Sequence, residues 1–395
     1  MIEPAGHGKF CARNNEAGAP VPNDIPGEPM DRRSQDGEPP LHVLLCPDQP
    51  GWAFDNIADT IARHAGGNRV SKLYMRDTIG KEHVFFRAIL LKRIDLCHVF
   101  WREDLFYLLH PTTIRRAAGE LGLDFDVLAK GISRCAFTTS VYDHLFTDPE
   151  EMRKRRARFA CIDGYTVSSQ RLLAAYSADP DLPAPDIVIT DGVDLERFSP
   201  APGPAGRPVP TVGWVGNSAW GHTARKEDVK GYRRLFVPMM AELAARGIAA
   251  EPNVADPQQR RIPFEDMPDF YRATDVFVCT SLMEGTPNPV LEAMACGIPV
   301  VSTDVGIVPE AFGDLQRRFI IAEPTVAAFA DAVAELLANP ALRRALGAEN
   351  RARMQDWSWE IRTRDWWPFW RRVVQRSMDL RGSIRRELSL HMVDA

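Results

Sequence analysis

The sequence predicts an α/β protein built from two Rossmann-like halves. Three observations predict it. The chain has 395 residues, which corresponds to two or three domains of ordinary size. Short apolar runs alternate with helical patterns along most of its length, and a proline-rich stretch interrupts that alternation near the middle. Strands that alternate with helices form parallel sheets whose two faces the helices cover.

Composition and charge narrow the class of protein. Hydrophobic residues make up 45% and charged residues 26%, a balance typical of a soluble globular enzyme with substantial cores. The formal net charge of −5 argues against a dedicated nucleic-acid binder, so we expect no nucleic acid as a partner. No apolar run approaches the roughly 18 residues of a spanning helix, and residues 1–20 lack the apolar core of a secretory signal.

The cysteines predict a reducing compartment. There are seven, widely spaced, without a C-x-x-C pair, and most lie in apolar strand-like runs. This pattern favours reduced core cysteines over a disulfide framework or a zinc site. We therefore expect a cytoplasmic protein that holds no metal.

The first half of the chain predicts one domain over residues 41–198. Residues 1–40 are rich in Pro, Gly and charge without periodicity, so we expect a disordered or loosely attached tail. A helical pattern follows from residue 54 to about residue 64. Strand-like runs, short and apolar, occur at residues 41–45, 95–100, 135–141, 164–168 and 186–190.

The second half predicts another domain of the same kind. Residues 199–210 contain a run of Pro and Gly and predict a hinge linker. Residues 211–356 then return to alternating patterns, and residues 357–395 begin with an aromatic and basic segment. Strand-like runs lie at 211–216, 273–280 and 298–303, and helical patterns at 266–272, 289–295 and 325–337.

Residues 281–301 carry the most specific pattern. Glu284 lies in a loop beyond a strand end, Asn288 and Pro289 favour the N-cap and first position of a helix, and Glu292 falls one turn into that helix. Ligands of open α/β sheets bind beyond the carboxyl ends of strands, and a helix N-terminus attracts an anion. The pattern predicts a phosphate site between two carboxylates that bind the hydroxyls of a sugar and a ribose. Its alternative is that Glu284 caps the loop and Glu292 is a solvated helix residue.

Four segments, taken in order, resemble glycosyltransferase family 4, retaining enzymes of the GT-B fold. They are residues 190–200, residues 264–278, the E-x7-E motif of Glu284 and Glu292, and residues 357–360. The resemblance implies a GT-B architecture with two Rossmann-like domains that face each other across a cleft. The first domain is then the acceptor-binding one and the second binds the nucleotide sugar, while residues 357–395 form a C-terminal helix that crosses back to the first.

The resemblance also implies roles for single residues. Glu292 holds the ribose hydroxyls, Glu284 contacts the donor sugar near the reacting carbon, and Lys230 stabilises the leaving diphosphate. His144 matches a histidine beside the donor sugar, so it joins Glu284 and Lys230 as a catalytic candidate; its alternative is a loop cap. The other donor-binding candidates are Gly51, Gly216, Asn217, Arg225, Thr286, Pro287, Asn288 and Val290.

Two further positions bear on the binding sites. Asn217 stands where the family usually has an Arg, and either Arg225 or Lys226 in the following loop replaces that charge or the diphosphate site is weakened. Gly51 matches the glycine of the first strand–helix loop, where the backbone can approach donor or acceptor. His98 is either structural or on the acceptor side.

The cluster of basic residues at 152–158 has two interpretations. It is a solvated helix face, or it attracts anionic lipid head groups and places the protein peripherally at the inner face of a membrane, beside a lipid-linked acceptor.

The function that these expectations imply is retaining hexosyl transfer from a nucleotide-diphosphate sugar to an acceptor hydroxyl. We expect a UDP-sugar first and a GDP-sugar next, with no metal or other cofactor. The acceptor is a carbohydrate, a lipid-linked compound or a small molecule, in glycan, glycolipid or glycosylated-metabolite biosynthesis. Two alternatives remain: a nucleotide-sugar epimerase of GT-B fold, and a catalytically weak nucleotide-sugar-binding subunit, which Asn217 favours.

Overall fold

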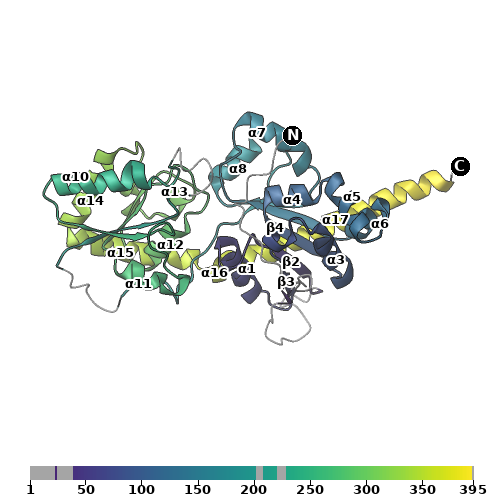
Figure 1. Ribbon diagram of the computed structural model, residues 1–395, viewed down its shortest axis with the longest axis horizontal. Coiled ribbons are helices and arrows are strands. Elements are labelled where there is room, and N and C mark those ends of the chain that lie inside the picture. The colour runs from purple at the N-terminus through teal and green to yellow at the C-terminus, as the bar shows by residue number, and fades with distance from the viewer. Residues whose placement is uncertain (1–22, 25–38, 202–207, 220–227, 394–395) are drawn as a thin grey trace.

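The structure contains two α/β domains, each built on a parallel sheet, which confirms the predicted fold class (Figure 1). The computed structural model describes residues 23–24, 39–201, 208–219 and 228–393, with the helix after Leu380 described as backbone alone. Most of the tail predicted over residues 1–40, part of the predicted hinge, and both Arg225 and Lys226 lie outside the described residues.

The N-terminal domain has a seven-stranded sheet in the order β1-β3-β2-β4-β5-β6-β7. All neighbouring strands are parallel except β1, which pairs antiparallel with β3 at the sheet edge, so two residues of the predicted tail attach to the domain. The strands are β1 (Asn23–Asp24), β2 (His42–Cys46), β3 (Arg69–Lys72), β4 (Leu96–Trp101), β5 (Ala136–Val141), β6 (Gly164–Val167) and β7 (Ile187–Val188).

Helices cover both faces of this sheet because alternate strand residues are apolar on both sides. Leu44 and Cys97 pack with helices α3 to α6 on one face, whereas Val43 and Leu96 pack with α1 on the other. The helices are α1 (Ala53–Arg63), α2 (Met75–Thr78), α3 (Glu82–Lys92), α4 (Arg102–Leu108), α5 (Pro111–Glu120), α6 (Phe125–Ile132), α7 (Pro149–Phe159) and α8 (Gln170–Ser177).

The C-terminal domain has a five-stranded parallel sheet in the order β12-β11-β10-β8-β9. Helices α11 and α12 pack on one face, and α10 and α14 on the other. The strands are β8 (Thr211–Val215), β9 (Glu251–Ala255), β10 (Val276–Cys279), β11 (Val300–Thr303) and β12 (Ile320–Ile321). The helices are α10 (Val237–Ala245), α11 (Met267–Arg272), α12 (Asn288–Ala295), α13 (Val308–Ala311), α14 (Val326–Ala338) and α15 (Pro340–Arg353), and a π-helical turn (Tyr232–Phe236) precedes α10.

The chain then returns to the N-terminal domain. The short helix α16 (Trp359–Arg362) leads into α17 (Trp366–Val393), which runs along that domain (Figure 1). Trp366 and Trp370 are buried against the residues of β2 and β4 that face α1, because apolar side chains three and four residues apart share one face of a helix. The Trp367 indole donates to the His64 carbonyl at 3.1 Å, and Arg371 donates to the Asn68 carboxamide at 2.9 Å.

Replacement of Trp370 by Ala is therefore expected to destabilise the N-terminal domain, although this residue follows the C-terminal domain in the sequence. The fully buried ring leaves a cavity that costs about 3–5 kcal/mol. Hydrogen exchange should show faster exchange of peptides from β2 and β4 with unchanged protection of β8 and β10. Met378→Ala, at an exposed position of the same helix, should change neither.

Candidate functional site

The two domains meet at loops that follow the carboxyl ends of their strands. The loop after β10 approaches the loops after β5 and β6 so closely that a Cβ on Gly285 would lie 1.8 Å from the Tyr142 carbonyl oxygen and 2.6 Å from the Ser168 hydroxyl. Only a residue without a side chain fits there. Since open α/β sheets bind ligands at these strand ends, the meeting point of the loops is the candidate site.

Polar contacts between the domains surround this approach. The Asn288 amide donates to the Asp191 carboxylate at 3.2 Å, and the Gln170 backbone N–H donates to Glu310 at 3.0 Å. Arg171 pairs with Asp304 at 2.8 Å at a half-exposed position. The loops of both domains are therefore joined by side chains as well as by close backbone packing.

Lys230 and Glu284 lie in direct contact. The Lys230 ammonium donates to the Glu284 Oε1 atom at 2.6 Å, and the Ser281 hydroxyl donates to the same oxygen at 2.6 Å. The side chains retain 23% and 15% of their exposure, so a ligand can reach both. The structure thus brings together two of the three predicted catalytic residues and adds Ser281, which the sequence analysis did not single out.

Backbone packing holds Lys230 beside the end of β10. The Thr280 hydroxyl donates to the Lys230 carbonyl at 2.7 Å, and the Leu282 N–H donates to the Val229 carbonyl at 2.8 Å. Gly231 has a φ of +72°, and a Cβ there would lie 2.2 Å from the Thr280 carbonyl oxygen. This glycine allows the loop after β8 to lie against the loop after β10, which places the ammonium at the carboxylate.

Glu292 is held one turn into α12. Its Oε2 atom accepts a hydrogen bond from the buried Tyr271 hydroxyl at 2.6 Å. Burial raises the pKa of Glu292 to about 7, against the opposite effect of the Tyr271 hydrogen bond. Glu292 is therefore not the solvated helix residue of the alternative interpretation. Tyr271 lies 21 positions earlier on α11, and no local pattern indicates that contact.

The start of α12 differs from the prediction. Asn288 is the first residue of the helix rather than its N-cap, and its amide donates to Asp191 in place of capping the backbone. The Thr286 hydroxyl and the Asn288 amide oxygen are buried without a hydrogen-bond partner in the described chain. Buried polar atoms without partners are rare, so this pair indicates a place for a polar ligand.

Pro287 and Val290 were predicted to bind the donor, and the structure shows the environment of their side chains. Both are buried, Val290 completely within the core between α11 and α12, and the Val290 N–H donates to the Pro287 carbonyl at 2.8 Å. They shape the first turn of the helix, and their role in donor binding stays a prediction.

Asn217 forms hydrogen bonds within and beside its own loop. Its amide oxygen accepts hydrogen bonds from the Ala219 N–H at 3.0 Å and from the Gln258 amide at 3.3 Å. The Gly216 N–H donates to the Ala255 carbonyl at 3.1 Å, and a Cβ at Gly216 would lie 2.7 Å from the Trp214 ring. The pair stabilises the loop after β8, and Asn217 supplies no charge in place of the expected Arg.

His144 follows β5 and carries a neutral imidazole. Its Nε2 atom is buried and has no hydrogen-bond partner in the described part of the chain. Burial lowers the pKa of His144, and the nearby Arg171 charge lowers it further. The Thr147 hydroxyl donates to the His144 carbonyl, so His144 is hydrogen-bonded to its loop through its backbone.

The other two predicted positions in the N-terminal domain behave differently. His98 is completely buried between the hydroxyls of Thr138 and Ser140, and burial lowers its pKa to about 3, which favours the structural interpretation. Gly51 has a φ of +72°, donates its N–H to the Asp55 carboxylate at 2.8 Å, and has open space where a side chain would lie.

Several polar residues of the N-terminal domain near the contact were missed by the sequence analysis. The hydroxyls of Ser168 and Thr190 are buried without partners among the described residues. Asp191 is only 4% exposed, and burial raises its pKa to about 7. Their positions in the sequence could have identified them, because all three residues follow strand ends of a parallel sheet.

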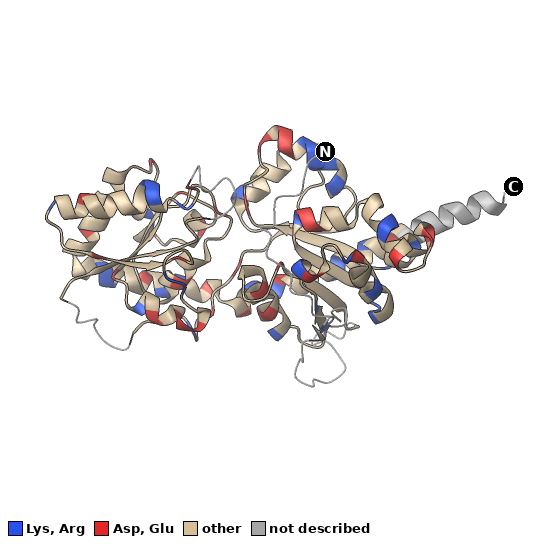
Figure 2. Ribbon diagram, in the orientation of Figure 1, with Lys and Arg blue, Asp and Glu red and all other residues tan. Residues whose placement is uncertain are grey.

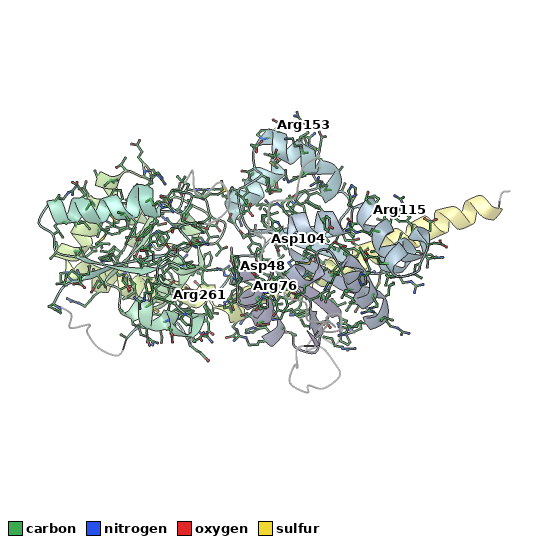
Figure 3. All side chains as sticks on the ribbon, in the orientation of Figure 1. Asp48, Arg76, Asp104, Arg115, Arg153 and Arg261 are labelled. Atoms are coloured by element: carbon green, nitrogen blue, oxygen red, sulfur yellow. The ribbon has the colours of Figure 1, made fainter. Side chains whose placement is uncertain are left out.

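A second polar surface lies at the carboxyl ends of β2 and β4. The Asp48 Oδ1 atom is buried without a partner in the described chain, and burial together with the Asp48 charge raises the pKa of Asp104 to about 7. Figure 3 shows both residues on the side of the N-terminal domain that faces the other domain. Trp52 follows in the same loop and is 51% exposed. Carboxyl groups beside an exposed indole suit a hydroxyl-rich molecule.

Four of the five basic residues in the cluster on α7 form ion pairs within the chain. Lys154 pairs with Glu150 and Glu151, and Arg156 pairs with Asp179 and Asp181. On α7 the acidic residues lie in the first turn and the basic residues follow, and both colours are spread over the two domains (Figure 2). The pairing favours a solvated helix face. Within the part of the chain that the structure describes, no helix combines the length and apolarity needed to cross a membrane.

Metal-ligating side chains do not cluster in the described ranges: no group of three or more His, Cys, Asp or Glu residues there is placed to hold a metal ion. No disulfide joins the six cysteines of the described chain.

Asp191→Asn is expected to stabilise the protein increasingly as pH rises. The pKa of Asp191 is raised in the folded state. The carboxyl group therefore makes its full contribution to the free energy of unfolding below the usual Asp pKa, and this contribution is lost as pH rises to about 7. Between pH 5.5 and pH 8 the wild type should lose on the order of 2 kcal/mol relative to the variant. Urea unfolding at both pH values measures this difference, and an equal effect at the two would contradict it.

Part of this chain is similar to known proteins. Residues 259–353 match the family model described as Glycosyl transferases group 1. The D-inositol 3-phosphate glycosyltransferase of Streptomyces bingchenggensis is 29% identical over 222 residues, which cover 49% of this chain and 48% of that protein. The chain thus spans about half the length of this curated relative.

Solved structures of low sequence identity share the fold. A glycosyltransferase from Rickettsia africae has a TM-score of 0.61 at 12% identity and covers 85% of this chain and 99% of its own. Anabaena Alr3699/HepE, solved in complex with UDP-glucose, has a TM-score of 0.52 at 14% identity, with 87% and 100% covered. The protein therefore has the GT-B fold, and its residues 259–353 are similar to the Glycosyl transferases group 1 family.

Proposed function

We propose that the protein is a retaining glycosyltransferase of family 4 that transfers a hexosyl group from a nucleoside-diphosphate sugar to an acceptor hydroxyl. The observation that carries the proposal is the contact of the Lys230 ammonium with the Glu284 carboxylate, at 2.6 Å, in the loops where the two domains meet. The group 1 domain over residues 259–353 supports it, because Glu284 and Glu292 both lie within that segment.

Lys230 and the N-terminus of α12 are the groups that hold the diphosphate. Both are positive where a leaving diphosphate develops negative charge, and a preorganised cation at that point lowers the barrier. When the diphosphate binds, its oxygens compete with Glu284 for the ammonium. Glu284 then accepts from a donor-sugar hydroxyl and keeps its hydrogen bond from Ser281. Because a cation and a helix terminus provide the charge, we propose that the transfer needs no metal.

Glu292 is proposed to bind the ribose. A carboxylate accepts two hydrogen bonds from a vicinal diol, and these bonds favour the ionised form over the protonated one. The Tyr271 hydroxyl occupies the other side of the carboxylate and fixes its orientation. The unpartnered Thr286 and Asn288 atoms lie on the adjacent turn, where they can bind polar groups of the same donor.

The N-terminal domain supplies the other side of the reaction. The neutral His144 presents its unpartnered Nε2 atom to the donor sugar, and the acceptor hydroxyl attacks on the face from which the diphosphate departs, giving up its proton to the departing phosphate oxygen. Packing of Gly285 against Tyr142 excludes water and so suppresses hydrolysis of the donor.

Donor and acceptor classes are also proposals. A UDP-sugar is the first donor and a GDP-sugar the next, the former supported by the UDP-glucose complex of the Anabaena structure. Trp52, Asp48 and Asp104 form a surface for a hydroxyl-rich acceptor, such as a carbohydrate, a lipid-linked compound or a small molecule. The free cysteines support a reducing, cytoplasmic location.

A second candidate is a nucleotide-sugar-binding subunit with weak catalysis. The observation that favours it is the engagement of Asn217 within its own loop, where a cation is expected. Tight nucleotide binding without turnover on any acceptor would support this candidate, whereas conversion of the donor in the absence of acceptor would indicate an epimerase.

The function is tested by nucleotide binding followed by transfer. One of UDP, GDP, ADP and dTDP should raise the melting temperature, and the matching donor should release its diphosphate in proportion to acceptor glycosylation. Glu284→Gln should lower kcat by about 10²–10³-fold because it removes charge that the transition state uses, and should leave nucleotide affinity nearly unchanged. Glu242→Gln, at an exposed position on α10, is the matched control. Full transfer by the Glu284 variant would refute the assignment.

Gly285→Ala should separate the domains. A Cβ at 1.8 Å from the Tyr142 carbonyl cannot be accommodated without movement of one loop. We expect a larger radius of gyration by small-angle scattering and a transfer rate lowered by at least about 100-fold, since misplacement of reacting groups by an ångström has that effect. Nucleotide binding should persist because its residues belong to one domain. Gly119→Ala, where a Cβ meets nothing within 4 Å, should leave size and rate unchanged.

A further inference from the structure

We propose that Arg102 is a positioning residue for His144. It fixes the loop of residues 142–147, and through that loop it sets the direction of the imidazole. The inference rests on the proposed function, in which His144 lies beside the donor sugar.

Arg102 binds the residue that precedes His144. Its guanidinium is completely buried and donates two hydrogen bonds to the Asp143 carboxylate, at 3.1 and 2.9 Å. The Asp143 Oδ1 atom also accepts from the Leu145 N–H at 2.9 Å. One carboxylate therefore connects the guanidinium to the backbone on both sides of His144.

The same guanidinium contacts the loop beyond His144. The centre of the Phe146 ring lies 4.9 Å from the Arg102 guanidinium and 3.7 Å from that of Arg155. Arg155 is itself held by Glu103 at 2.7 Å and by Glu151 at 2.6 Å. Cations over an aromatic ring attract it, so the loop is held at Asp143 and again at Phe146.

These contacts orient His144 through its loop and not through a hydrogen bond to the Nε2 atom. No described residue bonds the His144 Nε2 atom, so the ring direction must come from its backbone and from packing. A buried ion pair contributes little net stability, because the loss of hydration offsets the attraction, but it specifies one geometry by its two parallel bonds. The sequence offers no sign of the pair, since its members are 41 positions apart.

The test is a double-mutant cycle between Arg102 and His144. Arg102→Gln should lower kcat by about 10–100-fold while the KM for the donor changes by less than about threefold, because the chemical step depends on ring geometry. In the His144→Ala background the same change should lower kcat by less than about twofold. A loss of equal size in both backgrounds, or no loss in the wild type, would overturn the proposal. Arg156→Gln, which breaks two ion pairs on α7, is the matched control and should keep kcat within about twofold.

Two further measurements protect the test. If Arg102→Gln does not fold, Arg102→Met combined with Asp143→Leu replaces the pair by apolar groups, and the same criteria apply to it. The His144 imidazole resonances, identified by their absence in His144→Ala, should shift or broaden in the Arg102 variant and stay unchanged in the Arg156 control. Unchanged resonances in the Arg102 variant would overturn the proposal. Since this measurement needs no turnover, failure of the transferase assignment is distinguishable from failure of the positioning role.

Discussion

The approach of the Gly285 backbone to the Tyr142 carbonyl is the constraint on which the candidate site depends. It joins two domains whose cores are otherwise separate, and it does so at the strand ends that carry Lys230, Glu284 and His144. This contact is made by backbone atoms, so no side chain can adapt to a change in it. The relative position of the two sheets therefore fixes the residues on either side of the contact. The segment that leads into α17 reinforces that relation, because Trp357 is buried in the core of the C-terminal domain and Trp366 in that of the N-terminal one.

Buried carboxyl groups give this region a common electrostatic character. Asp104, Asp191 and Glu292 each have a pKa raised to about 7 by burial, and they lie near strand ends or one turn into a helix that follows one. Such groups cost free energy in the ionised form unless hydroxyl or amide donors reach them. A sugar nucleotide and a polyol acceptor are rich in those donors. Hydrogen bonds from a hydroxyl-rich molecule would favour the ionised form of these carboxyl groups.

The fold and the local part of the site were predictable from sequence, and the contacts between distant segments were not. Apolar runs located eight strands of the two sheets, because a buried parallel strand needs a continuous apolar run, and the E-x7-E spacing located Glu284 and Glu292. They did not locate β1, β3, β9 and β12, which are short or partly polar. The contacts of Tyr271 with Glu292, of Asp191 with Asn288 and of Arg102 with Asp143 join residues 21, 97 and 41 positions apart, so no pattern in a single sequence encodes them. Asn288 was mistaken for an N-cap because its local context is that of a cap, while a partner in the other domain takes its side chain.

The two halves of the site are built by different means, and the segment that matches a family model lies in one of them. In the C-terminal domain, glycine contacts and short backbone bonds place Lys230 beside Glu284, an arrangement that suits any diphosphate donor. That domain contains residues 259–353, which match a family model. In the N-terminal domain, buried ion pairs and aromatic rings hold the loops that we propose to bind the acceptor. The pair of Arg102 and Asp143 belongs to this second half and lies outside the segment that matches the family model.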